Sequence, residues 1–238
     1  MEGFSYHNIF ESKGIQYIAI IIFFMVLIPF WLLLNKSNRI GNKIREGFGV
    51  LSSKILKLPQ GLFFYRNHTW AYLEKTGNAR VGLDEMLLHL TGEVRLESAR
   101  KSGDQVSRGD LIATLSRDDR QLSIYSPISG QITDVNEVAA SEPETLHRDP
   151  YGEGWVYKIK PSDWIAETQQ SFLAEKAVAW SGRELTRIKD FMAGTSGEHH
   201  PGYAAVVLQD GGEIMENALS ELPGEAWQKF QQEFLSIA

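Results

Sequence analysis

The sequence predicts a mainly β domain that follows an N-terminal transmembrane helix and precedes a C-terminal α+β extension. An uncharged apolar run occupies residues 15–34, short alternating runs broken by glycines fill 61–163, and a helical pattern returns after that. We therefore divide the 238 residues into four parts, which are 1–35, 36–60, 61–163 and 164–238.

Composition excludes several kinds of chemistry. The chain has no cysteine, so disulfides, thiolate catalysis and cysteine-ligated metals are excluded. Its net charge of −6 argues against nucleic-acid binding, which needs a basic face. No glycine-rich phosphate loop, nucleophile elbow or paired-histidine zinc motif occurs. We therefore expect no enzyme activity, no catalytic residue, no cofactor and no small-molecule substrate.

Residues 15–34 are expected to form a single membrane span. A helix of this length, at about 1.5 Å per residue, crosses the roughly 30 Å hydrocarbon core of a bilayer. A cleaved signal peptide is the alternative, but Glu2 and Glu11 replace the basic start that such peptides have. The positive-inside rule places the amino terminus outside the cytoplasmic (inner) membrane and the rest in the cytoplasm. Only Lys13 precedes the span, whereas it is followed by Lys36, Arg39, Lys43 and Arg45.

The linker, residues 36–60, is predicted to be a basic amphipathic helix. Apolar residues recur in it at helical spacing, namely Ile40, Ile44, Phe48, Leu51 and Ile55. Such a helix either lies on the anionic inner leaflet or packs against protein, and the sequence leaves both alternatives open.

Residues 61–163 carry the period-two runs and frequent turns that are typical of a compact β sandwich or barrel. Several motifs follow one another in this region: His68-Thr69-Trp70, Val81-Gly82-Leu83-Asp84, Gly109-Asp110, Tyr125-Ser126-Pro127 and Asp149-Pro150-Tyr151-Gly152-Glu153-Gly154-Trp155. In these motifs and their order the region resembles the glycine cleavage system H-protein family. The resemblance implies a lipoyl-domain-like barrel-sandwich hybrid of small antiparallel sheets. It also implies a carrier of lipoate, held on a lysine at the tip of an exposed hairpin.

The tip departs from this family at the position of the lysine. The spacing from Gly109 to Pro127 matches the family without a gap, and it places Asp119 where the resemblance implies the lysine. Ser116-Arg117 also replaces the glutamate–serine pair of the family. A carboxylate cannot form the amide that holds lipoate, so we expect the lipoylation site to be lost.

Four charged residues form the predicted tip, Arg117, Asp118, Asp119 and Arg120. We favour a solvated hairpin tip, because charge clusters are usually solvated loops. The alternative is a docking surface whose arginines pair with carboxylates of a partner. Metal binding by the two aspartates has too few ligands nearby. We interpret His68 as part of a strand opening and His199-His200 as part of a loop, so no metal site is expected.

The extension, residues 164–238, is expected to begin with a helix from Ile165 to about Met192 that ends in a glycine-containing segment. A strand over 203–208 and the turn signal Asp210-Gly211 then predict a hairpin. Pro223 opens a final helix with an aromatic stripe, formed by Trp227, Phe230 and Phe234. The stripe can pack on the β domain or dock to another subunit, and we favour the first.

Together these features indicate a non-catalytic, membrane-anchored interaction subunit or scaffold. We expect other subunits of a multi-subunit membrane complex as partners, and by analogy with the redox enzymes that lipoyl carriers serve, a respiratory or redox complex. Two alternatives remain. One is an active lipoyl carrier modified at a non-standard lysine, of which Lys101 is the nearest upstream. The other is a decoy regulator of enzymes that handle lipoate.

Overall fold

The structure is a computed structural model that describes Tyr17, residues 20–27, Val50–Leu51, residues 56–199, Leu208–Gln209 and residues 213–236. The chain divides into two compact units, Met1–Phe48 and Gly49–Ala238. In the first unit the described residues are helical, and their apolar side chains are exposed. Among all described residues, no helix is both long and apolar enough to cross a membrane. The remainder of the predicted span, 15–34, lies outside the described residues.

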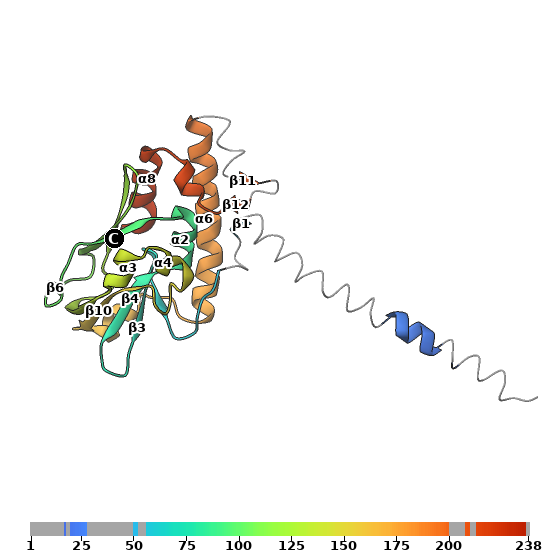
Figure 1. The fold of residues 1–238 in the computed structure, drawn as a ribbon, viewed down its shortest axis with the longest axis horizontal. Coiled ribbons are helices and arrows are strands. Elements are labelled where there is room, and N and C mark those ends of the chain that lie inside the picture. The colour runs from blue at the N-terminus through green and yellow to red at the C-terminus, as the bar shows by residue number, and fades with distance from the viewer. Residues whose placement is uncertain are drawn as a thin grey trace, which may run out of the picture. The chain divides into compact units, whose positions relative to one another are not determined.

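The second unit is mainly β, with a helical region at its C-terminal end (Figure 1). Its largest sheet has six antiparallel strands in the order β2-β3-β4-β10-β9-β6. They are β2 (Phe63–Phe64), β3 (Thr69–Leu73), β4 (Ala79–Leu83), β10 (Trp155–Pro161), β9 (Gly130–Val135) and β6 (Gln105–Val106).

A second antiparallel sheet has the order β5-β7-β8. Its strands are β5 (Arg95–Ser98), β7 (Leu111–Arg117) and β8 (Arg120–Tyr125). Alternate side chains of β8 are buried, as a strand with one face on the core requires. In β7 the neighbours Ile112 and Ala113 are both buried, because the register shifts between Leu111 and Ala113. Leu115 and Leu122 of this sheet belong to the same apolar core as Val81 and Tyr157 of the first sheet. The two sheets therefore share one core.

Three short helices connect the strands: α2 (Glu85–Thr91), α3 (Glu137–Ser141) and α4 (Glu144–Arg148). Asp84 caps α2 by accepting a hydrogen bond from the backbone N–H of Leu87 at 2.8 Å. The helix ends at Gly92, whose φ of 66° suits a residue without a β-carbon.

The predicted helix from Ile165 to Met192 is two helices, so the prediction of one continuous helix is wrong. The helices are α5 (Trp164–Thr168) and α6 (Glu175–His199). Between them, Phe172 forms an antiparallel bridge with Phe64, with backbone N–H···O distances of 2.8 and 2.9 Å in the two directions. Those two hydrogen bonds hold the backbone extended, so the helix cannot continue. The second helix also runs past Gly194, where the sequence predicted its end.

A third sheet joins sequence-distant parts of this unit in the order β1-β12-β11. Its strands are β1 (Val50–Leu51), β12 (Glu213–Met215) and β11 (Leu208–Gln209). Strands β11 and β12 pair antiparallel, as the predicted hairpin requires, although Asp210-Gly211 itself lies outside the described residues. The predicted linker helix is wrong at Val50–Leu51, because this pair forms a strand against β12 and fully buries Leu51. Residues 36–49 and 52–55 of the linker lie outside the described residues.

The chain then forms three short helices, η1 (Ala218–Glu221), α8 (Gly224–Phe230) and the π-helical η2 (Gln231–Leu235). Trp227, Phe230 and Phe234 are almost completely buried in the shared core. This confirms that the aromatic stripe packs on the β domain. Figure 1 shows α8 in red, beside α6.

Candidate functional site

The β7–β8 hairpin ends in a two-residue turn formed by Asp118 and Asp119. Arg117 of β7 lies opposite Arg120 of β8 in the strand register, and Asp118 adopts a φ of 53°. Hairpins of this length require positive φ in the turn, and aspartate tolerates it better than most residues. The side chains of Asp118 and Asp119 are 72% and 95% exposed. Both carboxylates are therefore exposed, and that of Asp118 also accepts a hydrogen bond from Nη2 of Arg120 at 3.2 Å.

Arg120 points away from solvent and binds the C-terminal extension. Its Nη1 donates to the carbonyl oxygens of Ser220 and Leu222 at 2.6 and 2.9 Å. Its guanidinium also lies 5.4 Å from the centre of the Trp227 ring. Only 16% of the Arg120 side chain remains exposed, so this residue links the hairpin to η1 and α8.

Further along the hairpin, Gln231 extends the same contact. Its side-chain amide accepts from the backbone N–H of Ser123 at 2.6 Å and donates to the Ser123 carbonyl at 3.1 Å. Strand β8 lies at the edge of its sheet, and an edge strand presents unpaired backbone groups. Gln231 therefore satisfies backbone groups of β8 as a neighbouring strand would.

Of the four tip residues, the two aspartates are exposed and the two arginines are partly buried. Arg117 donates from Nη1 to the carbonyl oxygen of Thr91 at 3.0 Å, and Arg120 is held by the extension. Both arginines bind backbone carbonyls of their own chain. Docking of the tip to a partner stays a prediction. Within the described residues no group of three or more metal-ligating side chains forms. His199 is the last residue of α6, and His200 lies outside the described residues.

Lys101 lies on a different turn from the hairpin tip, between β5 and β6. Its backbone N–H donates to the Asp104 side chain at 2.8 Å, and the turn is completed by Gly103 with a φ of 97°. Its side chain is exposed.

A buried ionic cluster around His68 was not predicted from the sequence. His68 immediately precedes β3, in agreement with its interpretation as part of a strand opening. It is fully buried and has a φ of 58°. Its Nδ1 lies 2.8 Å from an Asp84 oxygen, and its Nε2 lies 3.9 Å from a Glu184 oxygen on α6. Arg187 in turn binds both oxygens of Glu184 at 2.8 and 2.9 Å. The cluster thus joins α6 to the β domain.

The pKa of His68 is raised above its ordinary value. Burial opposes this shift by penalising the charged imidazolium. The Coulomb attraction and hydrogen bond of Asp84, with the charge of Glu184, outweigh the burial and the repulsion from Arg187. The cluster therefore favours the protonated histidine.

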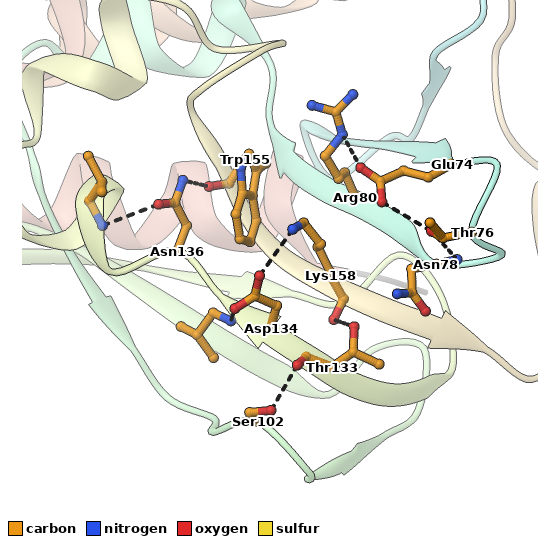
Figure 2. Close-up of polar contacts among 12 residues, drawn as sticks. Glu74, Thr76, Asn78, Arg80, Ser102, Thr133, Asp134, Asn136, Trp155 and Lys158 are labelled. Atoms are coloured by element: carbon orange, nitrogen blue, oxygen red, sulfur yellow. Dashed lines mark hydrogen bonds and ion pairs between the residues drawn. The ribbon is translucent and has the colours of Figure 1, made fainter.

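The segment before β10 is held by a polar network that includes Asn136 and Asp149. Asp149 accepts hydrogen bonds from the backbone N–H groups of Gly152 and Glu153, both at 3.0 Å. A β-carbon on Gly152 would collide with that carboxylate, so the turn requires glycine. Figure 2 shows the Asn136 side chain pointing to the carbonyl of Trp155, to which it donates at 2.6 Å.

The adjoining strands β9 and β10 are joined by a second group of contacts, also drawn in Figure 2. Lys158 forms an ion pair with Asp134 at 3.0 Å, and its ammonium lies 4.6 Å from the centre of the Trp155 ring. Thr133 donates to the Lys158 carbonyl at 3.1 Å. These partners are all within the chain, so we assign this network to the packing of the sheet.

Residues 62–181 match the family model described as "Glycine cleavage H-protein". The chain therefore belongs to the glycine cleavage H-protein family. It is 34% identical over 107 residues to the glycine cleavage system H protein of Halorhodospira halophila, covering 45% of this chain and 82% of that protein. It is 31% identical over 120 residues to the probable glycine cleavage system H protein of Pyrococcus horikoshii, covering 50% and 89%.

Among solved structures, the chain is similar to the crystal structure of a glycine cleavage system H protein from Mycobacterium marinum. That similarity has a TM-score of 0.44 and 24% identity, and it covers 53% of this chain and 98% of the other. The family match ends at Ser181, so η1, α8 and η2 all lie outside the matched region. The groups that hold Arg120 are therefore additions to the family domain.

Proposed function

We propose that this protein is a non-catalytic, membrane-anchored interaction subunit or scaffold that uses an H-protein-like domain without carrying lipoate. The observation that carries the proposal is the exposed turn of the β7–β8 hairpin, where Asp119 occupies the position at which the family resemblance implies a lysine. A carboxylate cannot form an amide with lipoate. The two sheets with their shared core support a barrel-sandwich arrangement of the domain.

The contacts of the tip support this proposal in a second way. A swinging arm needs a tip that is free to enter the active sites of other enzymes. Here the residue next to Asp119 is bound to two carbonyls of the extension, and Gln231 binds the strand behind it. A hairpin held in this manner is suited to forming a rigid interaction surface and not to carrying a swinging arm.

Intact-mass measurement of the protein purified from its native membranes tests the loss of the carrier role. We expect the mass of the unmodified chain, with a lipoylated H protein from the same cells as the positive control. A lipoyl adduct on any residue, with Lys101 the first to examine, would refute the proposal.

We further propose that the uncharged run at residues 15–34 anchors the chain in the cytoplasmic membrane, with the folded domain in the cytoplasm. The support is the excess of lysine and arginine after the run. A phosphatase reporter that is active only outside the cytoplasm, fused after residue 238, should stay inactive. The same reporter fused before residue 15 should be active, and the opposite pair of results would reverse the orientation.

The partners are proposed to be other subunits of a membrane complex. By analogy with the redox enzymes that lipoyl carriers serve, this is proposed to be a respiratory or redox complex. An anchor raises the local concentration of the domain at a membrane partner without new contacts. Purification in a mild detergent, followed by mass spectrometry of the co-purifying chains, identifies these partners. Known membrane complexes that survive the same detergent serve as the control. Recovery of this chain alone, under conditions in which those complexes stay intact, would contradict a stable complex.

A further inference from the structure

A cavity of about 740 Å³ lies where the family domain meets the added C-terminal residues. The β domain contributes the turns that carry Tyr65 and Arg108, α6 contributes Lys176, and η2 contributes Phe234. This volume is in the range of sites for small molecules, which is about 300–1,000 Å³. Because the family match ends before η2, the complete cavity is a feature of this chain and not of the matched domain alone.

The lining of the cavity is cationic, although the chain as a whole carries a net charge of −6. Four lining side chains are basic, and the acidic one among them is Glu233. Arg187 is paired with the carboxylates of Glu184 and Glu233. The other basic residues have no carboxylate within ion-pair distance anywhere in the described part of the chain. These three residues are Arg66, Arg108 and Lys176.

Two buried polar atoms of the lining residues have no hydrogen-bond partner among the described residues. They are the hydroxyl oxygen of Tyr65, a residue only 3% exposed, and Nε of Arg108. The nearby carboxylate of Glu167 is bound instead to the backbone N–H and the hydroxyl of Ser129. Burial raises the pKa of Tyr65, so its hydroxyl keeps its proton and is a donor at physiological pH. Both unpartnered atoms are buried beneath the surface of the cavity wall.

A ligand oxyanion in the cavity supplies the negative charge that the three unpaired basic residues lack. A phosphate monoester fits better than a carboxylate, because it carries nearly two charges and three acceptor oxygens, against one charge and two oxygens. The apolar side chains of Phe172 and Phe234 also line the cavity, so an apolar body attached to the anion has a surface to pack on. We propose that this cavity binds a small organic phosphate whose anionic group is held by Arg108 and Lys176. This site goes beyond the sequence-based expectation, which included no small-molecule ligand.

Phosphorus NMR of phenyl phosphate, titrated with the full-length chain in an uncharged detergent, tests the proposal. We expect broadening and saturation of the phosphate signal with a dissociation constant below about 1 mM. Inorganic phosphate lacks the apolar body and benzoate lacks the second charge, so each should bind at least tenfold more weakly in a competition titration. No saturable binding of phenyl phosphate, or benzoate binding as tightly, would overturn the proposal.

Substitutions locate the binding in this cavity. Arg108→Gln and Lys176→Gln should each weaken phenyl phosphate binding about tenfold, because each removes one unpaired cation. Lys176 is exposed on α6, so its replacement leaves the fold intact and keeps the test decisive if Arg108→Gln fails to fold. Arg95→Gln removes an exposed arginine of β5 that does not line the cavity, and it is the matched control for net charge. Equal affinity of Lys176→Gln and Arg95→Gln would place the binding elsewhere and refute this site.

Discussion

Replacement of Arg120 by alanine should release the C-terminal extension from the β7–β8 hairpin. The side chain donates to two carbonyl oxygens, and hydrogen bonds that involve a charged group contribute about 1.5–3 kcal/mol each. The contact with Trp227 adds about 0.5–1 kcal/mol. Because both bonds share one nitrogen and the guanidinium is partly hydrated, we expect a loss of about 3 kcal/mol in all.

Hydrogen exchange of the backbone amides in α8 measures this loss directly. A loss of about 3 kcal/mol corresponds to roughly a hundredfold faster exchange through local opening. Arg117→Ala is the matched control, because Arg117 sits opposite Arg120 but binds the Thr91 carbonyl and not the extension. Asp119→Ala should change exchange little, since that side chain is exposed and lies 3.8 Å from the guanidinium. Exchange in α8 that is no faster in Arg120→Ala than in Arg117→Ala would refute the reasoning.

Two further predictions concern stability. The charged form of His68 stabilises the fold fully below its ordinary pKa of 6.5, and this contribution is lost as the pH rises through the raised pKa. Glu184→Gln removes one source of that shift in pKa. Urea unfolding at a series of pH values should therefore show that the variant loses less stability above pH 6.5 than the unaltered chain does. An unchanged pH dependence would contradict the role of the cluster. Gly82→Ala should destabilise the fold by about 1–3 kcal/mol in the same assay, because the new methyl carbon would lie 2.5 Å from the buried ring of Trp70. Gly182→Ala is the control, because nothing lies within 4 Å of its new methyl group, and it should stabilise α6 by up to about 1 kcal/mol. Equal effects of the two changes on stability would show that the predicted clash at Gly82 is absent.

The elements that sequence patterns predicted well are those determined by nearby residues. The alternating run at the start of β7 predicted a strand, because strand period is a local property, and the family resemblance predicted the hairpin and the position of its tip. The aromatic stripe of the final helix predicted its buried face for the same reason.

The features that sequence patterns missed depend on partners far along the chain. Arg120 binds the carbonyls of Ser220 and Leu222, and every residue type has such a carbonyl, so no side-chain pattern marks the partner. The break before α6 likewise depends on backbone hydrogen bonds between Phe172 and Phe64. His68 showed only its place at the start of a strand, since the sequence does not reveal that Glu184 packs against it.

The pairing of β1 with β12 has a consequence for the order of events during synthesis. Val50 pairs with Met215, so the partner strand does not exist until nearly the whole chain has been made. At about 5–20 residues per second, translation takes roughly ten to thirty seconds to cover that interval. The strand that follows the proposed anchor therefore stays without its partner until that point in synthesis. Closing so long a loop also makes this pairing a late step in refolding. A ribosome stalled before residue 213 would hold a chain whose first strand still lacks its neighbour.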